Sequence, residues 1–160
     1  AEFGDLVVKP RTGAGGVGVV LIESSLPLDS VVLPPGSLVV QPMVASVRER
    51  GEISVFVIDG RATSMVHKTP AQAEIRVHDH LGGTYVQVPV EGEAAAAALP
   101  AMSAAAEFCG RPLDYGRVDL LHHDGVWRVS EVEAIEPALY LDTFVDNAEP
   151  FADLVLARTR

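Results

Sequence analysis

The chain has 160 residues, of which 48% are hydrophobic, and it carries a formal net charge of −10 and a single cysteine. A single cysteine excludes an internal disulfide framework, and the negative charge argues against the basic face of a nucleic-acid-binding protein. No run of about 18 apolar residues that could span a membrane appears in the sequence. We therefore expect a cytoplasmic chain of one compact domain or two small lobes that binds neither membrane nor nucleic acid.

A glycine-rich segment near the start separates two predicted strands, Leu6–Lys9 and Val17–Ile22. The pattern that begins at Gly13 fits G-x-G-x-x-G, but no helix follows it, no Gly-Lys-Ser/Thr of a P-loop is present, and the kinase motifs H-R-D and D-F-G are missing. Because glycine lacks a Cβ, the backbone N–H groups of such a flap can approach phosphate oxygens, and Lys9 stands at the strand end beside it. A mobile hairpin with a surface lysine is the alternative.

The middle of the chain alternates turn signals with short apolar runs. Residues 24–37 are rich in proline and predict a loop, and Leu38–Gln41 predicts a short strand that ends at Pro42. Ile53–Ile58 and Ala62–His67 predict a hairpin around the dipeptide Asp-Gly at residues 59–60. Residues 72–83 are polar and end in glycine, which predicts a long loop.

Two helices are predicted in the second half. Glu91–Cys109 is rich in alanine, the residue with the highest helix propensity, and Pro100 is expected to split or kink it. Asn147–Arg160 predicts a closing helix with one apolar stripe formed by Phe151, Leu154 and Val155. Hairpins joined by occasional helices predict an α+β fold with mostly antiparallel sheet.

Three acidic residues lie in otherwise apolar strands of a second predicted hairpin, Arg117–Leu121 and Val126–Glu133. Glu131 and Glu133 are two residues apart and therefore share a face of their strand. Isolated buried carboxylates are costly, and a divalent cation would stabilise them; Mg²⁺ prefers such oxygen ligands together with phosphates. The alternative is a solvated sheet face with paired charges.

Whether Asp119 joins the two glutamates depends on the register of the hairpin. A strict two-residue turn at Asp-Gly would pair Val118 with Glu131 and place Asp119 on the opposite face. A three-residue loop would pair Arg117 with Glu131 and bring all three acids to one face. We therefore predict an odd-length loop or a bulge in this hairpin.

Two histidine pairs are weaker metal candidates. His122 and His123 are adjacent in a turn, where side chains diverge, and His78 and His80 lie in a polar loop without a cysteine or a third histidine. Neither pair supports a metal site by itself.

The order of these motifs resembles the ATP-binding part of ATP-grasp ligases, closest to the prokaryotic glutathione synthetase-like group. The resemblance extends from Asp5 to about Tyr140 and rests on DLVVKPRTGAGGVGV, LVVQPMV, GEISVFVIDG, HKTP through IRVHDHLGG, RVDLL and SEVEAIEP. It implies an ATP-grasp portion with two small lobes, residues 1–45 with the glycine flap and residues 46–160 with the metal-binding strands. The N-terminal domain that precedes such lobes is expected to be absent.

The resemblance also implies roles for individual residues. Lys9 would contact ATP phosphates and Gly15 and Gly16 would cover them. The adenine would be flanked by Gln41, Pro42, Met43 and Val44. Glu52 would hold the ribose hydroxyls, and Arg76 would stabilise the transferring phosphoryl group. Mg²⁺ would bind to Asp119, Glu131 and Glu133, although the last ligand is often Asn in glutathione synthetase.

The implied activity is an ATP- and Mg²⁺-dependent carboxylate–amine ligase that acts through an acyl phosphate. In such a reaction positioning and charge neutralisation supply most of the catalysis. The expected partners are ATP, a small carboxylate and an amine such as an amino acid or peptide, with a homodimer possible. The alternative is a nucleotide-binding module that does not catalyse.

Overall fold

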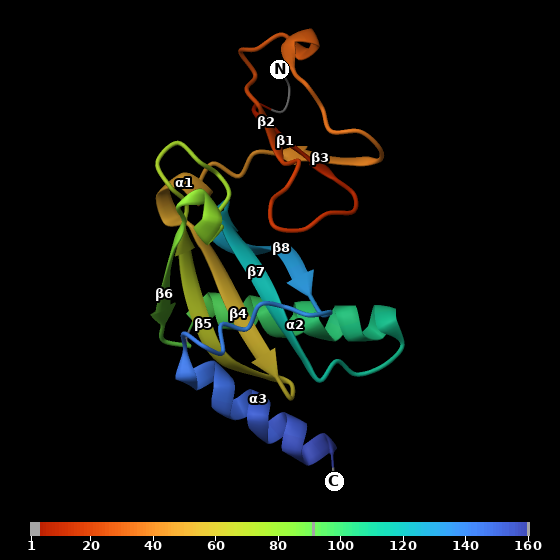
Figure 1. The fold of residues 1–160 in the computed structure, drawn as a ribbon, viewed down its shortest axis with the longest axis vertical. Helices are drawn as coiled ribbons and strands as arrows, with labels where there is room; N and C mark the ends of the chain where they lie inside the picture. The colour runs from red at the N-terminus through yellow and green to blue at the C-terminus, as the bar shows by residue number, and fades with distance from the viewer. Residues whose placement is uncertain (1–3, 91, 160) are drawn as a thin grey trace. The chain divides into compact units, whose positions relative to one another are not determined.

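The structure is a computed structural model that describes residues 4–90 and 92–159. Its contacts divide the chain into two compact units, Ala1–Ala45 and Ser46–Arg160. Each unit is built on an antiparallel sheet, and the larger one also carries the long helices (Figure 1). The predicted α+β class with mostly antiparallel sheet is confirmed. Neither of the long helices nor any shorter one among the described residues has the combined length and apolarity that crossing a membrane requires.

The first unit is a three-stranded sheet of order β2-β1-β3. Its strands are β1 (Leu6–Pro10), β2 (Val20–Ile22) and β3 (Leu38–Pro42), and Val7, Val8 and Ile22 are buried in it. A short 3-10 helix, Leu28–Ser30, lies in the predicted proline-rich loop. Strand β1 pairs with both neighbours, so that Val7 lies between Leu21 and Gln41.

The second predicted strand begins later than expected. Residues 15–18 form turns instead of extending β2, because Gly15, Gly16 and Gly18 have φ angles of 61°, 68° and 76°. Extended strands do not adopt positive φ, which glycine reaches without steric cost. A Cβ on Gly18 would also lie 2.8 Å from the Cγ of Pro10, so the loop closes tightly on the end of β1. The glycine loop is therefore longer, and strand β2 shorter, than predicted.

The second unit is a five-stranded sheet of order β6-β5-β4-β7-β8. Its strands are β4 (Glu52–Ile58), β5 (Arg61–Thr69), β6 (Thr84–Val88), β7 (Tyr115–His123) and β8 (Val126–Glu133). Both predicted hairpins are confirmed, whereas β6 and the one-turn helix α1 (Val47–Arg50) were not predicted. The predicted loop before β6 contains the 3-10 turn Asp79–Leu81.

Helix α2 (Gly92–Cys109) covers one face of this sheet (Figure 1). Ala94, Ala98 and Met102 of the helix pack on the apolar residues of β4 and β7 in a single buried core. The helix continues through Pro100, so the expected split at this residue is wrong, and the expected kink stays a prediction. The missing N–H of a proline removes one hydrogen bond, and the packed alanine-rich turns on either side outweigh that loss. Glu91, the expected first residue, lies outside the described residues.

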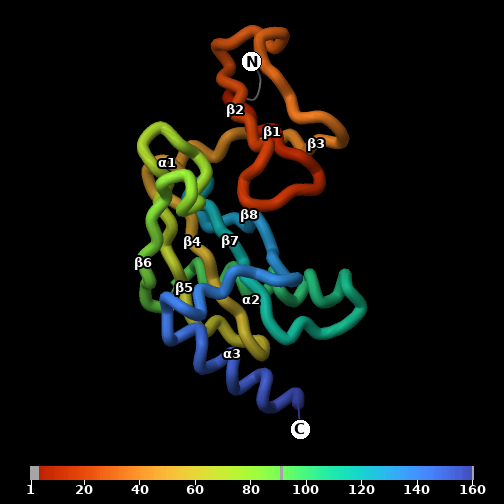
Figure 2. Tube along the Cα trace, viewed as in Figure 1, coloured from red at the N-terminus to blue at the C-terminus, as the bar shows by residue number. Residues whose placement is uncertain are grey.

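Helix α3 (Val145–Arg158) packs against β4 and β5 (Figure 2). It begins two residues earlier than predicted, and the expected last residue, Arg160, lies outside the described residues. Leu154 is buried and Phe151 packs on the aromatic cluster of this face, but Val155 is 44% exposed. The other buried position of α3 is Asn147, whose side-chain amide donates to the carbonyl of Leu139 at 2.6 Å.

Candidate functional site: an acidic cluster between two buried cations

Both hairpins turn on Asp-Gly and both contain a β-bulge. In β4–β5 the pairs Phe56–Ser64 and Val57–Ala62 leave Thr63 without a partner. In β7–β8 the pairs Asp119–Glu131 and Leu120–Val129 leave Ser130 without one. An extra residue shifts every pairing beyond it by one position, which decides the face to which the later side chains point.

The bulge in β7–β8 brings three carboxylates together on one face of the sheet. Asp119 pairs directly with Glu131, and Arg117 pairs with Glu133. One carboxylate oxygen from each of Asp119, Glu131 and Glu133 lies within 4.8 Å of the others, and we call these three residues the acidic cluster. The turn at residues 124–125 has two residues, so the three-residue loop is wrong, while the bulge offered as its alternative is present.

Arg117 holds two of the three carboxylates. Its Nε and Nη2 atoms donate to the two oxygens of Asp119 at 2.9 and 2.8 Å, and Nη2 also donates to Glu133 at 2.5 Å. Its Nη1 donates to the carbonyl of Ala138 at 3.2 Å, which ties down the segment that follows β8. Four of the five guanidinium N–H groups are thereby used, and only 7% of the side chain is exposed. Arg117 therefore organises the acidic cluster from within the protein.

Lys68 approaches the same cluster from β5. Its Nζ atom lies 3.3 Å from Asp119 Oδ2 and 3.0 Å from Glu52 Oε1, and 6% of the side chain is exposed. Ser54 lies between them on β4 and donates to Asp119 Oδ1 at 2.5 Å. Cross-strand pairing explains this arrangement, because Glu52 pairs with Lys68 and Ser54 pairs with Asp119.

Burial and the two neighbouring cations change the pKa values of Glu52 and of two members of the acidic cluster, Asp119 and Glu133. Burial raises the pKa of Glu52 to about 7, although Lys68 opposes this shift. Burial also raises the pKa of Glu133. For Asp119 burial is again the largest influence, but Lys68 and Arg117 together outweigh it and lower the pKa. Of Glu52, Asp119 and Glu133, only Asp119 therefore has a pKa below its usual value.

The donor set fits a hard divalent cation. All three groups of the acidic cluster are carboxylates, and they range from the buried Asp119 through Glu133 to the exposed Glu131, so one side of the cluster is open. Three negative charges face two positive charges, from Lys68 and Arg117, and a negative balance remains. A Mg²⁺ ion that also coordinates phosphate needs a carboxylate site with one side left open for the phosphate oxygens.

Arg76 lies in the loop before β6 and forms a bidentate pair with Glu74. Its Nε and Nη2 atoms donate to the two oxygens of Glu74 at 3.1 and 2.6 Å. These hydrogen bonds lower the pKa of Glu74 to about 2.

In the same loop His78 has a buried Nδ1 atom without a hydrogen-bond partner among the described residues, and burial lowers its pKa, with Lys68 and Arg117 contributing. The loop therefore belongs to the surroundings of the buried cations.

The remaining expected nucleotide contacts lie in the first unit. Lys9 lies on β1 opposite Val39 of β3, and Gly15 and Gly16 lie in the glycine loop that follows β1. Gln41 and Pro42 end β3, and the N–H of Met43 donates to the backbone carbonyl of Asp5 at 2.8 Å, with Val44 next along the chain. The expected adenine segment is thus tied to the start of the same sheet.

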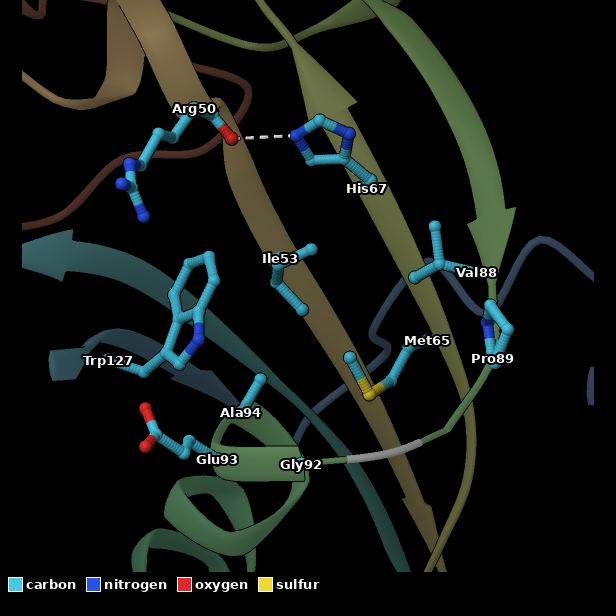
Figure 3. A pocket seen from close by; sticks show the side chains of 10 residues that line it. All are labelled: Arg50, Ile53, Met65, His67, Val88, Pro89, Gly92, Glu93, Ala94 and Trp127. Carbon is cyan, nitrogen blue, oxygen red and sulfur yellow. Dashed lines mark hydrogen bonds between the residues drawn. The ribbon is translucent and has the colours of Figure 1, made fainter.

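The opposite face of the larger sheet holds a shallow cavity of about 630 Å³. Ile53, Met65 and Val88 line it beside Trp127 (Figure 3). His67 Nε2 lies 2.6 Å from the carbonyl oxygen of Arg50 at its edge. None of the acidic cluster lines this cavity, because alternation directs those side chains to the other face. The acidic cluster therefore lies on the face that α2 does not cover.

Glycine loop, paired hairpins and a carboxylate cluster on two adjacent strands define an ATP-grasp protein. The sequence profile of the RimK-like ATP-grasp domain matches residues 3–142, and the chain belongs to that family. A probable alpha-L-glutamate ligase from Aliivibrio salmonicida is 34% identical over 82% of the chain and 42% of its own length. A glutathione synthetase from Mesorhizobium japonicum is 35% identical over 51% of the chain and 28% of its own length.

Solved structures agree on the fold. The crystal structure of a D-cycloserine synthetase has a TM-score of 0.81 and 28% identity, over 99% of this chain and 57% of that chain. A D-alanine–D-alanine ligase from Bacillus anthracis complexed with ATP has a TM-score of 0.63 at 20% identity, over 96% of this chain and 53% of that chain. At this identity the two proteins share only their fold. The chain thus spans about half or less of the curated relatives it matches.

Sequence reasoning missed the two buried cations. Neither Lys68 nor Arg117 is among the predicted site residues, although both belong to segments that carry the family resemblance. The available signal was alternation: Arg117 is two residues before Asp119, and Lys68 follows Val66 at the same spacing in a buried strand. A basic residue on the inward face of an apolar strand needs a carboxylate partner, because burying an unpaired charge is very costly.

Proposed function

We propose that this protein is the ATP-binding portion of a carboxylate–amine ligase and uses Mg²⁺ at the acidic cluster. The observation that carries the proposal is the convergence of three carboxylates beside two buried cations, in a chain that belongs to the RimK-like ATP-grasp family. The family likeness supports ATP as the nucleotide, and the names of the relatives support amide-bond formation.

The chain's own residues would prepare the phosphoryl transfer. Asp119, Glu131 and Glu133 would hold Mg²⁺, and Arg117 would keep two of them oriented through its hydrogen bonds. When bound, Mg²⁺ neutralises charge on the phosphates and holds them in line for attack. Lys68 has one ammonium proton beyond its two contacts and would direct it to a phosphate oxygen.

The first unit would supply further contacts to the nucleotide. We propose that Lys9 pairs with the phosphates, that the N–H groups of Gly15 and Gly16 cover them, and that Gln41–Val44 flank the adenine. The positive φ values of the two glycines support this proposal, since they let backbone N–H groups converge on an anion. Arg76 would neutralise the acyl phosphate formed when a substrate carboxylate attacks ATP, and an amine would then displace phosphate. Glu52 would take the ribose hydroxyls, as the family likeness implies.

Product analysis tests the proposal. The protein is incubated with ATP, Mg²⁺ and mixtures of amino acids, and mass spectrometry is used to look for ADP together with an amide. Amide formation that disappears in Asp119→Asn would support a ligase. Binding of ATP and Mn²⁺ without any product would favour a nucleotide-binding module. A phosphorylated hydroxyl product without amide would contradict ligation.

A further inference from the structure

The cavity on the α2 side of the larger sheet has the size and the walls of a small-molecule site. Its volume of about 630 Å³ lies within the range of ligand pockets, roughly 300–1,000 Å³. Its floor is apolar, because the side chains of Ile53, Met65 and Val88 come from the neighbouring strands β4, β5 and β6. The indole of Trp127 stands at one side of this floor (Figure 3). None of the acidic cluster lines the cavity, so its chemistry is separate from that of the proposed metal site.

Two side chains of opposite charge stand at the mouth of the cavity. Arg50 ends α1 and Glu93 lies in the first turn of α2. Figure 3 shows the indole of Trp127 between their charged groups. Both side chains are exposed, and within residues 4–90 and 92–159 neither has an ion-pair partner. A ligand can therefore pair with each of them without breaking an ion pair of the protein.

The backbone that carries Arg50 is fixed against β5. His67 Nε2 donates to the carbonyl oxygen of Arg50 at 2.6 Å, which closes the end of α1. The next residue, Gly51, has a φ of 64°, and a Cβ there would lie 2.0 Å from the carbonyl oxygen of Lys68. Only glycine fits so close to the neighbouring strand. The guanidinium thus extends from a positioned backbone, and its own donors stay free for a ligand.

These features fit a ligand with two separated charges and an apolar ring between them. A single amino acid carries its ammonium and carboxylate on one carbon, whereas an extended dipeptide separates them by roughly 7 Å, at about 3.5 Å per residue. Each terminus of a dipeptide can therefore reach one end of the mouth. An aromatic side chain suits the interior, because aromatic rings pair favourably with an indole and with a thioether sulfur, here those of Trp127 and Met65.

We propose that this cavity binds a dipeptide with an aromatic side chain. Its carboxylate pairs with Arg50, its ammonium pairs with Glu93, and its ring packs against Trp127. The site goes beyond the nucleotide and metal chemistry of the opposite face and does not depend on it.

Tryptophan fluorescence measures this binding directly, because Trp127 is the single tryptophan of the chain. Titration with the dipeptide Ala-Phe, without ATP or metal, should give a saturable change with a dissociation constant on the order of 1 mM. N-acetyl-Ala-Phe lacks the ammonium and Ala-Phe-amide lacks the carboxylate. Each should bind about fivefold more weakly, the upper range for one exposed ion pair. Ala-Ala buries no ring and should bind at least about tenfold more weakly.

Three variants assign the two termini. Arg50→Gln should weaken binding of Ala-Phe about fivefold and leave binding of Ala-Phe-amide unchanged, because the amide has no charge to lose there. Glu93→Gln should weaken Ala-Phe by a similar factor and leave N-acetyl-Ala-Phe unchanged. Glu107→Gln removes a charge from an exposed position of α2 outside the cavity and is the matched control, without effect on any of the dipeptides.

Three results would overturn the proposal. The first is the absence of a saturable change when Ala-Phe greatly exceeds the expected dissociation constant. The second is an Arg50→Gln or Glu93→Gln protein that binds Ala-Phe as Glu107→Gln does. The third is a fluorescence that changes with protein concentration alone, together with dimer formation in analytical ultracentrifugation, which would assign the cavity to a second copy of the chain. The dipeptide series uses the unaltered protein, so the test does not depend on the folding of a variant.

Discussion

The two hairpins of the larger sheet have the same construction and different contents. Each turns on Asp-Gly, with φ angles of 50° and 73° at residues 59–60 and 51° and 80° at residues 124–125. Each contains one bulge. The first carries the cation Lys68 to the charged face and the second carries the acidic cluster. The comparison shows that turn chemistry builds the hairpin, whereas the position of the bulge decides which residues meet.

Removing the central carboxylate should give the largest effect. Asp119→Asn leaves Lys68 and Arg117 without their shared charge partner, and breaking such a buried pair costs about 3–5 kcal/mol of unfolding free energy. Mn²⁺ binding and turnover should be lost, because a metal supplies several kcal/mol of transition-state stabilisation, or about 100-fold or more in rate. Urea denaturation and electron paramagnetic resonance of Mn²⁺ measure these changes.

The turn aspartate of the same hairpin provides the control for this substitution. Asp124→Asn keeps a residue type that tolerates positive φ at an exposed position, so stability should stay within about 0.5 kcal/mol. Equal losses in Asp119→Asn and Asp124→Asn would contradict a special role for the acidic cluster.

Single-residue deletions in β8 test the bulge itself. Deleting Ser130 removes only the unpaired residue, so Asp119–Glu131 and Arg117–Glu133 should still pair and Mn²⁺ should still bind. Deleting Val132 instead moves Glu133 into the position opposite Val118, on the face covered by α2. Mn²⁺ binding should then fall below detection. If the two deletions have the same effect, the register explanation is wrong.

The pH dependence of stability tests the burial of Glu52. Because its pKa is raised from 4.5 to about 7 on folding, the folded state binds the proton more tightly, and stability falls as pH rises through this window. Glu52→Gln cannot titrate, so the parent should lose stability relative to the variant between pH 4.5 and 7. The difference should be about 2–3 kcal/mol, since one pKa unit corresponds to about 1.4 kcal/mol.

Urea denaturation at a series of pH values measures this difference. The lowered pKa of His78 acts with the opposite sign, because its contribution is lost as pH falls, but it is common to both proteins and cancels. Parallel curves for the parent and Glu52→Gln would refute the raised pKa.

Turn substitutions should give the smallest effects and should be alike in both hairpins. Gly60→Ala and Gly125→Ala place a Cβ at φ angles of 73° and 80°, which costs about 1 kcal/mol each. Gly13→Ala, at a glycine without positive φ and with only ordinary contacts, is the control and should cost less. Thermal denaturation compares the three. A loss of Mn²⁺ affinity in Gly125→Ala without loss of stability would show that the turn also governs the site.

The sequence alone determined the two hairpins, the two long helices and the candidates for the acidic cluster, because alternation, alanine content and Asp-Gly turns act over a few neighbouring residues. Only the tertiary structure decided that Thr63 and Ser130 are the extra residues, and that Lys68 and Arg117 flank Asp119. Residues far apart in the chain reach one face through strand register, and register depends on the whole sheet and its core. A one-residue shift has no local signature, yet it reverses the face to which every later side chain points.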